Sequence, residues 1–181
     1  MRTTTLLALP LIAALAACTT TRTVQPATSH GSSDYPDVQA SAPGKATCVA
    51  TTAADNAAAA AATNAARARS GLAPVKANDR LAKAAAAHAC DMAQRGLMAH
   101  QGSTTTGPSQ RVKAQGYRPA LTAENIAAGP FDRARVLAEW NGSQGHLSNI
   151  MIPSLREVGI GRAIGSDGRT VFWAAVYAQP R

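Results

Sequence analysis

The sequence predicts an α+β domain in which the helices come first and the strands last. After residue 47, apolar residues recur at helical spacing in segments that end at glycines. From Val158 onward the spacing changes to alternation, and the last stretch is rich in Val, Phe, Trp and Tyr. The alternating strand and helix segments that indicate a parallel sheet are missing, so we expect a layered α+β fold. Residues 48–181 suit one domain with a single core.

The N-terminus has the pattern of a secretory signal. An apolar run over residues 6–17 follows Arg2 and ends in small residues. A membrane span needs roughly 20 apolar residues, so this run is too short to be one. We predict a signal peptide over residues 1–17 that is removed from the mature protein.

The next residue is predicted to carry a lipid. The sequence Leu15-Ala16-Ala17-Cys18 resembles the bacterial lipobox, in which the Cys sulfur is acylated and becomes the new N-terminus. Several acyl chains would give stable membrane attachment. Thr19 follows, and in such lipoproteins the absence of Asp there permits transfer to the outer membrane. We therefore predict secretion across the inner membrane and anchoring at the outer membrane, facing the periplasm; an ordinary signal that ends near a Cys is the alternative.

Residues 18–47 are predicted to be the lipidated Cys and a flexible tether. They are rich in Thr, Ser, Pro, Gly, Gln and Ala and show no periodic apolar pattern. The formal net charge of the chain is +8, and it falls to about +7 when Arg2 is removed. This charge favours anionic surfaces such as lipid head groups or cell-wall polymers, with a merely solvated basic surface as the alternative. Nucleic acid is not expected as a partner, since the basic residues are scattered and aromatics make up only 4%.

Two cysteines remain once Cys18 is assigned to lipid. Cys48 and Cys90 would lie in an oxidising compartment, where paired cysteines form disulfides. We predict a Cys48–Cys90 bond. It would stabilise the fold by up to about 4 kcal/mol on the chain-entropy argument.

Two helices are predicted in the first half of the domain. Residues 53–70 are dominated by Ala, and Gly71 is placed to end the helix. Residues 80–95 form the second, capped by Asn78 or Asp79.

One face of the second helix is predicted to face the core. Its residues recur at spacings of four, three and four, which puts them on one side of the helix. His88 is among them, so we interpret it as a buried core histidine. The face consists of Leu81, Ala85, His88 and Met92.

Two further helices and an extended segment follow. A short helix is expected at 109–115, then an extended or loop segment at 121–127, then a helix at 132–141. Val136 and Trp140 lie one turn apart on the inner face of the last helix, and Trp140 is most simply a core aromatic.

The C-terminal segment reads as a β-hairpin. Residues 158–164 alternate, Gly165-Ser166-Asp167-Gly168 supplies a turn, and residues 170–177 form the second strand. Trp173 in this strand is also expected in the core.

Several short motifs follow one another along the domain. They are Asn64-x-x-Arg67-x-x-x-Gly71-Leu72, the helix leading to His100, Ala123-Glu124-Asn125-Ile126, Trp140-x-x-Ser143-x-Gly145-His146-x-x-Asn149-Ile150-Met151, Val158-Gly159-Ile160-Gly161 and Phe172-Trp173. Each motif is weak alone, but the ordered set covers nearly all of the chain after the tether. In this order they resemble the bacterial branch of the CAP (SCP-like) superfamily, which includes cysteine-rich secretory proteins, venom antigen 5 and plant pathogenesis-related proteins.

The resemblance implies a three-layer α-β-α sandwich with a central antiparallel sheet and a cleft in which His and Glu side chains converge. The matching residues here are His100, Glu124 and His146. Such a trio can hold a divalent metal, zinc above all, with one position left open. Alternatively, Glu124 can orient a His that acts as a general base. Zinc is the only cofactor suggested.

The chain departs from the family pattern at the cleft. Ser143 stands where animal and plant members have a second Glu, and Leu147 where bacterial members usually have Arg. These changes remove polar groups, so we assign no catalytic residue. Ser143 and Asn125 are further candidate cleft residues, with bracing of the loops as the alternative.

The leading functional hypothesis is an envelope-anchored module that binds a small hydrophobic ligand or an envelope partner. The alternative is a zinc-dependent hydrolase that acts on a cell-wall peptide or polymer. A third possibility is a structural lipoprotein that spaces the outer membrane from the wall. Signatures of serine hydrolases, zinc proteases, phosphate-binding loops and Cys-x-x-Cys redox sites are missing from the sequence.

Overall fold

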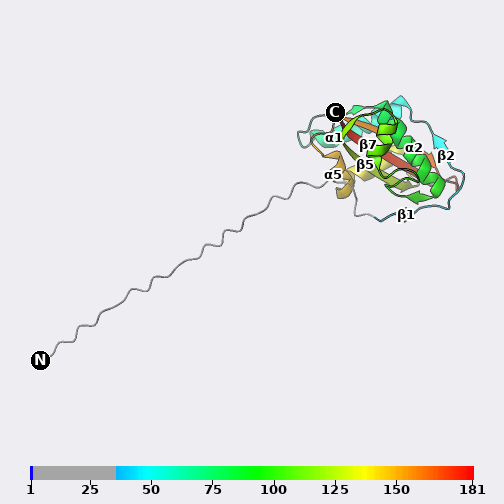
Figure 1. Cartoon of the computed structure of the whole chain (residues 1–181), viewed down its shortest axis with the longest axis horizontal. Coiled ribbons are helices and arrows are strands. Elements are labelled where there is room, and N and C mark those ends of the chain that lie inside the picture. The colour runs from blue at the N-terminus through cyan, green and yellow to red at the C-terminus, as the bar shows by residue number, and fades with distance from the viewer. Residues whose placement is uncertain (2–35) are drawn as a thin grey trace. The chain divides into compact units, whose positions relative to one another are not determined.

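The computed structural model describes Met1 and residues 36–181, and the latter fold around one central sheet (Figure 1). The sheet has five strands in the order β2-β6-β7-β5, and the short β3 pairs in parallel with the beginning of β6. The other pairs are antiparallel, as the sequence predicted. The strands are β2 (Thr47–Val49), β3 (Lys76–Ala77), β5 (Pro119–Gly129), β6 (Glu157–Ile164) and β7 (Val171–Pro180).

Helices cover both faces of the sheet, so the fold is the expected α-β-α sandwich. Alternate residues of β7 divide between two apolar cores: Trp173 and Tyr177 belong to one, Phe172 and Val176 to the other. The first core includes residues of α1 (Ala53–Ala68), α4 (Arg133–Gly142) and α5 (Gln144–Ile150). The second includes residues of α2 (Asp79–Arg95) and α3 (Pro108–Ala114).

Two glycines let α2 lie directly on β6. A Cβ atom on Gly159 would stand 2.1 Å from the backbone nitrogen of Ala82, and one on Gly161 would stand 2.1 Å from that of Ala86. No side chain fits in these gaps. Glycine therefore alternates with larger residues in β6, and the facing residues of α2 are mostly Ala. This pairing of small residues sets how closely the helix approaches the sheet.

The predicted elements are largely present. Helix α2 begins after Asn78, whose side-chain oxygen accepts hydrogen bonds from the backbone N–H groups of Arg80 and Leu81 at 2.9 and 3.1 Å. The C-terminal hairpin is confirmed in register by the pairing of β6 with β7. The segment predicted to be extended or loop is strand β5, the longest of the described strands, because it pairs along its length with β7. Helix α5 was not predicted.

The fold begins earlier than the predicted tether boundary at residue 47. Strand β1 (Val38–Gln39) pairs antiparallel with β4 (Leu97–Met98). The next two backbone N–H groups, of residues 40 and 41, donate to the carbonyl of Gly96 at 2.8 and 3.1 Å. Residues 36–39, here called the N-terminal strap, therefore belong to the domain. The predicted signal peptide, Cys18 and the first part of the tether lie outside the described residues.

The predicted disulfide is present. Cys48 in β2 is bonded to Cys90 in α2, and their Cα atoms are 5.1 Å apart. The bond ties the edge of the sheet to the helix that packs on it. Within residues 36–181, none of the helices combines the length and apolar character needed to cross a membrane.

Candidate functional site

A cleft of about 340 Å³ opens beside β5, a volume within the range of small-molecule sites. Residues of the strap, β4, β5, α4 and α5 line it, so segments that are far apart in the sequence build its walls. Its lining is mostly apolar, with a few polar groups. The apolar members are Pro36, Val38, Met98, Ala99, Ile126, Ala127, Ala128, Phe131 and Trp140, and the polar ones are Asp37, His100, Glu124, Glu139, Ser143, His146 and Asn149.

Glu124 and His100 form a hydrogen-bonded pair on the cleft wall. The Glu124 side chain is only 1% exposed, and its Oε1 lies 2.9 Å from Nδ1 of His100. Because a carboxylate only accepts, Nδ1 carries the proton, which leaves Nε2 of a neutral His100 as an acceptor. The pair thus presents a fixed imidazole, whose side chain is 34% exposed, at the cleft.

The second oxygen of Glu124 is held by a buried arginine. Arg111 of α3 donates from Nη2 to Glu124 Oε2 at 2.6 Å, and from Nη1 to the carbonyl of His100 at 3.1 Å and to Thr105 Oγ1 at 3.0 Å. Burial alone would raise the pKa of Glu124. The hydrogen bond from His100 and the charges of His88, Arg111 and His100 outweigh burial and lower it, so the carboxylate is ionised at neutral pH.

His146 and Ser143 approach the cleft from the other side. His146 lies in α5 and Ser143 directly precedes that helix. Burial lowers the pKa of His146, the charge of His100 lowers it further, and a hydrogen bond with the backbone of Ile126 partly offsets both. Its imidazole is therefore mostly neutral at pH 7.

Asn125 does not line the cleft, contrary to its assignment from sequence. It is 0% exposed, and its Nδ2 donates to the carbonyl of His146 at 3.1 Å. Its Oδ1 accepts from Asn149 Nδ2 at 2.9 Å, and the same Nδ2 donates to the carbonyl of Glu124 at 3.0 Å. Asn125 points away because residues alternate along a strand, so it braces α5 against β5.

His88 lies behind the cleft in the core, as its helical face predicted. It is 1% exposed, its Nε2 donates to the carbonyl of Ala99 at 3.0 Å, and it stands 3.7 Å from Glu124 Oε1. Burial is the main reason that its pKa falls to about 4, although the charge of Glu124 opposes this. His88 is therefore neutral at pH 7, and its charge acts on Glu124 only at acidic pH, where the imidazole is protonated.

The proposed zinc ligands do not fit a metal. Among the described residues no group of three or more His, Cys, Asp or Glu side chains is arranged to hold an ion. Both oxygens of Glu124 are already bonded, one to His100 and one to Arg111. A ligating Glu124 would have to leave Arg111 buried without its carboxylate, which is unfavourable. The sequence-based assignment of His100, Glu124 and His146 to a metal is not supported by this geometry.

Sequence reasoning missed three charged residues that shape the site. Arg111 had no sequence signal, because its partner is reached only through the fold. Asp37 was assigned to the tether, although the strap brings it to the cleft. Glu139 also lines the cleft. Its place in the sequence, directly before Trp140 and four residues before Ser143, was the only sign of a position near the cleft.

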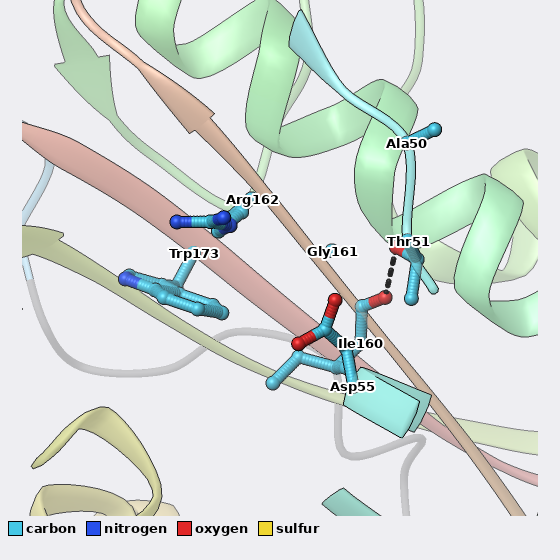
Figure 2. A pocket seen from close by; sticks show the side chains of 7 residues that line it. All are labelled: Ala50, Thr51, Asp55, Ile160, Gly161, Arg162 and Trp173. Atoms are coloured by element: carbon cyan, nitrogen blue, oxygen red, sulfur yellow. Dashed lines mark hydrogen bonds between the residues drawn. The ribbon is translucent and has the colours of Figure 1, made fainter. Parts of the chain in front are cut away.

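A second hollow, beside β6, is too small for a ligand. Figure 2 shows it between Asp55, Arg162 and Trp173, with Thr51 bonded to the carbonyl of Ile160 at 2.7 Å. Its volume of about 10 Å³ holds roughly one water. The Arg162 guanidinium lies 5.7 Å from the centre of a Trp173 ring, which is a cation–π contact. We interpret this hollow as a packing feature.

Glu124 orients His100, which is one of the two arrangements that the family resemblance implied. A histidine oriented by a carboxylate resembles half of a nucleophile–base pair, but a nucleophile must also lie within hydrogen-bond reach of the base. His100 is the histidine that Glu124 orients, and within residues 36–181 no hydrogen bond joins it to Ser143. The polar side chains His100, Ser143 and His146 thus lie in a cleft whose lining is mostly apolar.

Comparisons with known proteins agree with the fold. The chain is 34% identical over 99 residues to the uncharacterized protein YkwD of Bacillus subtilis (strain 168), a match that covers 55% of this chain and 38% of that protein. The chain thus spans well under half of this relative.

Solved structures show the same architecture. An extracellular protein containing a SCP domain from Bacillus anthracis str. Ames superposes with a TM-score of 0.61 and 23% identity, over 70% of this chain and 40% of that one. An outer surface protein from Borrelia burgdorferi gives 0.60 and 22%, over 72% and 96%. The sequence profile of CAP, the cysteine-rich secretory protein family, matches residues 60–177. The chain therefore belongs to the CAP family.

Proposed function

We propose that this protein binds a small hydrophobic ligand in the cleft beside β5. The observation that supports this most directly is the lining: a volume of about 340 Å³ bounded mainly by apolar side chains, with His100, His146 and Ser143 as orienting groups. Few convergent polar groups in an apolar cleft are typical of ligand sites. Burial of an apolar ligand at about 25 cal/mol per Å² supplies the driving force.

A zinc-dependent hydrolase is not the function we propose. The carboxylate that would ligate the metal or activate a water is held by Arg111 at 2.6 Å and by His100 at 2.9 Å. Both oxygens of the ionised Glu124 are thus engaged in hydrogen bonds within the protein, and neither is available to a metal or a water. We therefore favour ligand binding over hydrolysis as the function of the cleft.

The proposed place of action is the bacterial envelope. The names of two structural relatives describe an extracellular protein and an outer surface protein. Together with the predicted signal peptide and Cys18 lipidation, this supports a protein held at the outer membrane that meets lipids, cell-wall polymers or envelope proteins. In cells, the protein should incorporate labelled fatty acid, and Cys18→Ala should abolish that labelling. Equal labelling of the original protein and the variant would contradict an anchor at Cys18.

Ligand binding can be tested with N-phenyl-1-naphthylamine, an uncharged dye that fluoresces in apolar surroundings. The purified protein should bind it with one saturable site. Ser143→Phe places an aromatic ring in the cleft at a position whose side chain makes no capping hydrogen bond, and it should weaken dye binding at least tenfold.

Gln144→Phe is the matched control. Gln144 is the exposed neighbour of Ser143 in the chain and is not part of the cleft lining. The dye should bind this variant as it binds the unmodified protein. If the protein binds no dye, or if both variants bind it equally well, the cleft is not the binding site and the proposal fails.

A further inference from the structure

The charge of the cleft is opposite to that of the chain. The sequence has 18 Lys and Arg against 10 Asp and Glu. Yet three carboxylates, Asp37, Glu124 and Glu139, line the cleft, and within residues 36–181 no Lys or Arg lines it. A cleft in so basic a protein would be expected to include basic residues. Its lining therefore indicates which charge the ligand carries.

Two of the three carboxylates remain available to a ligand. The charge of Glu124 is compensated by Arg111, and its other oxygen accepts a hydrogen bond from His100. Asp37 is exposed on the strap and has no ion pair with any described residue. Glu139 has a side chain 55% exposed, and its one ion pair with a described residue, to Arg135 at 3.5 Å, is also exposed and thus weak. Asp37 and Glu139 together form what we call the acidic rim.

Each rim carboxylate lies next to apolar surface. Asp37 precedes Val38, and Glu139 precedes Trp140, and both of these neighbours line the cleft. A ligand with an apolar body in the cleft would bring its head group to the rim. An ammonium head would meet carboxylates there, whereas a carboxylate or phosphate head would meet like charge.

The protein's own Arg135 lies beside this rim. Its guanidinium lies 5.3 Å from the ring centre of Phe131, a cleft residue, and 3.5 Å from Glu139. An aromatic face beside a carboxylate is a favourable setting for an ammonium group. The Arg135 side chain is 63% exposed, so it can swing away and release this position to a ligand.

We propose that the cleft selects ligands with an apolar body and a cationic head, and disfavours the corresponding anions. This inference rests on the proposed function, because it specifies the ligand of the same cleft. The acidic rim supplies the selectivity and the apolar lining supplies most of the affinity.

The test is displacement of N-phenyl-1-naphthylamine at pH 7 by three amphiphiles with the same chain: dodecylammonium, dodecanol and dodecanoate, each below its aggregation threshold. We expect dodecylammonium to displace the dye at the lowest concentration and dodecanoate at the highest. One unit-charge contact near 4 Å in a water-like medium changes affinity about fivefold. Higher salt should weaken dodecylammonium and leave dodecanol unchanged.

Variants assign the effect to the rim. Glu139→Gln and Asp37→Asn should each weaken dodecylammonium about fivefold, with no change for dodecanol. Arg135→Gln removes the competing guanidinium, so dodecylammonium should bind this variant more tightly. Asp79→Asn is the control, since Asp79 is an exposed carboxylate at the first turn of α2, outside the cleft lining. It should change nothing.

The outcomes separate the two proposals. If the protein binds the dye but dodecanol or dodecanoate displaces it at the lowest concentration, the binding function stands and the charge selectivity is overturned. Preference for dodecylammonium that persists unchanged in Glu139→Gln and Asp37→Asn also overturns the role of the rim. Absence of dye binding and of all three amphiphiles overturns the proposed function, and the selectivity with it.

Discussion

Replacing Glu124 with Gln removes one negative charge from the cleft wall while nearly preserving the shape of the side chain. Glu124 is 1% and Arg111 6% exposed, so the variant leaves a buried guanidinium facing a neutral amide. Breaking a buried ion pair by removing one partner costs about 3–5 kcal/mol. The introduced amide retains one acceptor oxygen, so we expect the lower end of this range, about 3 kcal/mol.

Urea unfolding at pH 7 of the original protein and Glu124→Gln measures this loss. Glu139→Gln is the matched control, because its carboxylate is exposed, and it should lose less than about 1 kcal/mol. A loss from Glu124→Gln as small as that of the control would refute the conclusion that the Arg111–Glu124 pair supports the cleft wall.

The pH dependence gives a second check on the same pair. The pKa of Glu124 is lower in the folded protein than its ordinary value, so its contribution to stability is fully present above that ordinary value. It is lost as the pH falls through the lowered folded pKa. The gap in unfolding free energy between the original protein and Glu124→Gln should therefore narrow below about pH 4. A gap that is the same at pH 7 and pH 3 would show that shape, and not charge, causes the loss.

Three other perturbations test the fold around the site. Folding lowers the pKa of His88 to about 4, so stability should fall with pH from 6.5 to 4, by roughly 2–3 kcal/mol, and unfolding curves of His88→Gln should lack that slope. Gly161→Ala should lose about 1–3 kcal/mol or more in thermal or urea unfolding, because the new Cβ meets the backbone of α2, whereas Gly142→Ala, which has open space, should lose nothing. Cys48→Ser with Cys90→Ser should lose up to about 4 kcal/mol, and equal stability with and without reductant in the original protein would contradict this.

The elements that could be predicted from sequence are those with local signals. Helix α2 has a capping Asn78 at one end and Gly96 in the left-handed conformation at the other, both visible as residue types. The C-terminal hairpin has alternation and a turn around Asp167, whose side chain accepts from the backbone of Thr170 at 2.9 Å. Such signals depend on a few neighbouring residues, so they can be recognised in the sequence without knowledge of the fold.

The missed elements depend on distant partners. The strap is a strand only because Val38 and Gln39 pair with β4, far along the chain, and its composition resembles that of the tether. Helix α5 is short and has Gly145 in its first turn, so it shows little periodicity. Its position is set by Asn125 of β5, which donates to the carbonyl of His146 and accepts from Asn149, both in α5.

The candidate site was predicted in part. His100, Glu124, His146 and Ser143 line one cleft, and the family motifs indicated them. The chemistry was not predictable, because a sequence does not show that Arg111 reaches Glu124. A carboxylate beside two histidines suggests a metal; the same carboxylate held by a buried arginine does not.

The N-terminal strap gives the cleft a wall whose covalent link to the rest of the domain is exposed. Residues 42–45, which connect the strap to β2, are all exposed, and Lys45 is among them. A cut there would leave the Cys48–Cys90 bond intact. The strap would then be held without a covalent link, by its pairing with β4 and by the hydrogen bonds of residues 40, 41 and 44 to Gly96 and Gln94. Asp37 and Val38 would stay in the cleft wall only as long as these contacts hold, so the integrity of this wall depends on a segment that a single cut disconnects.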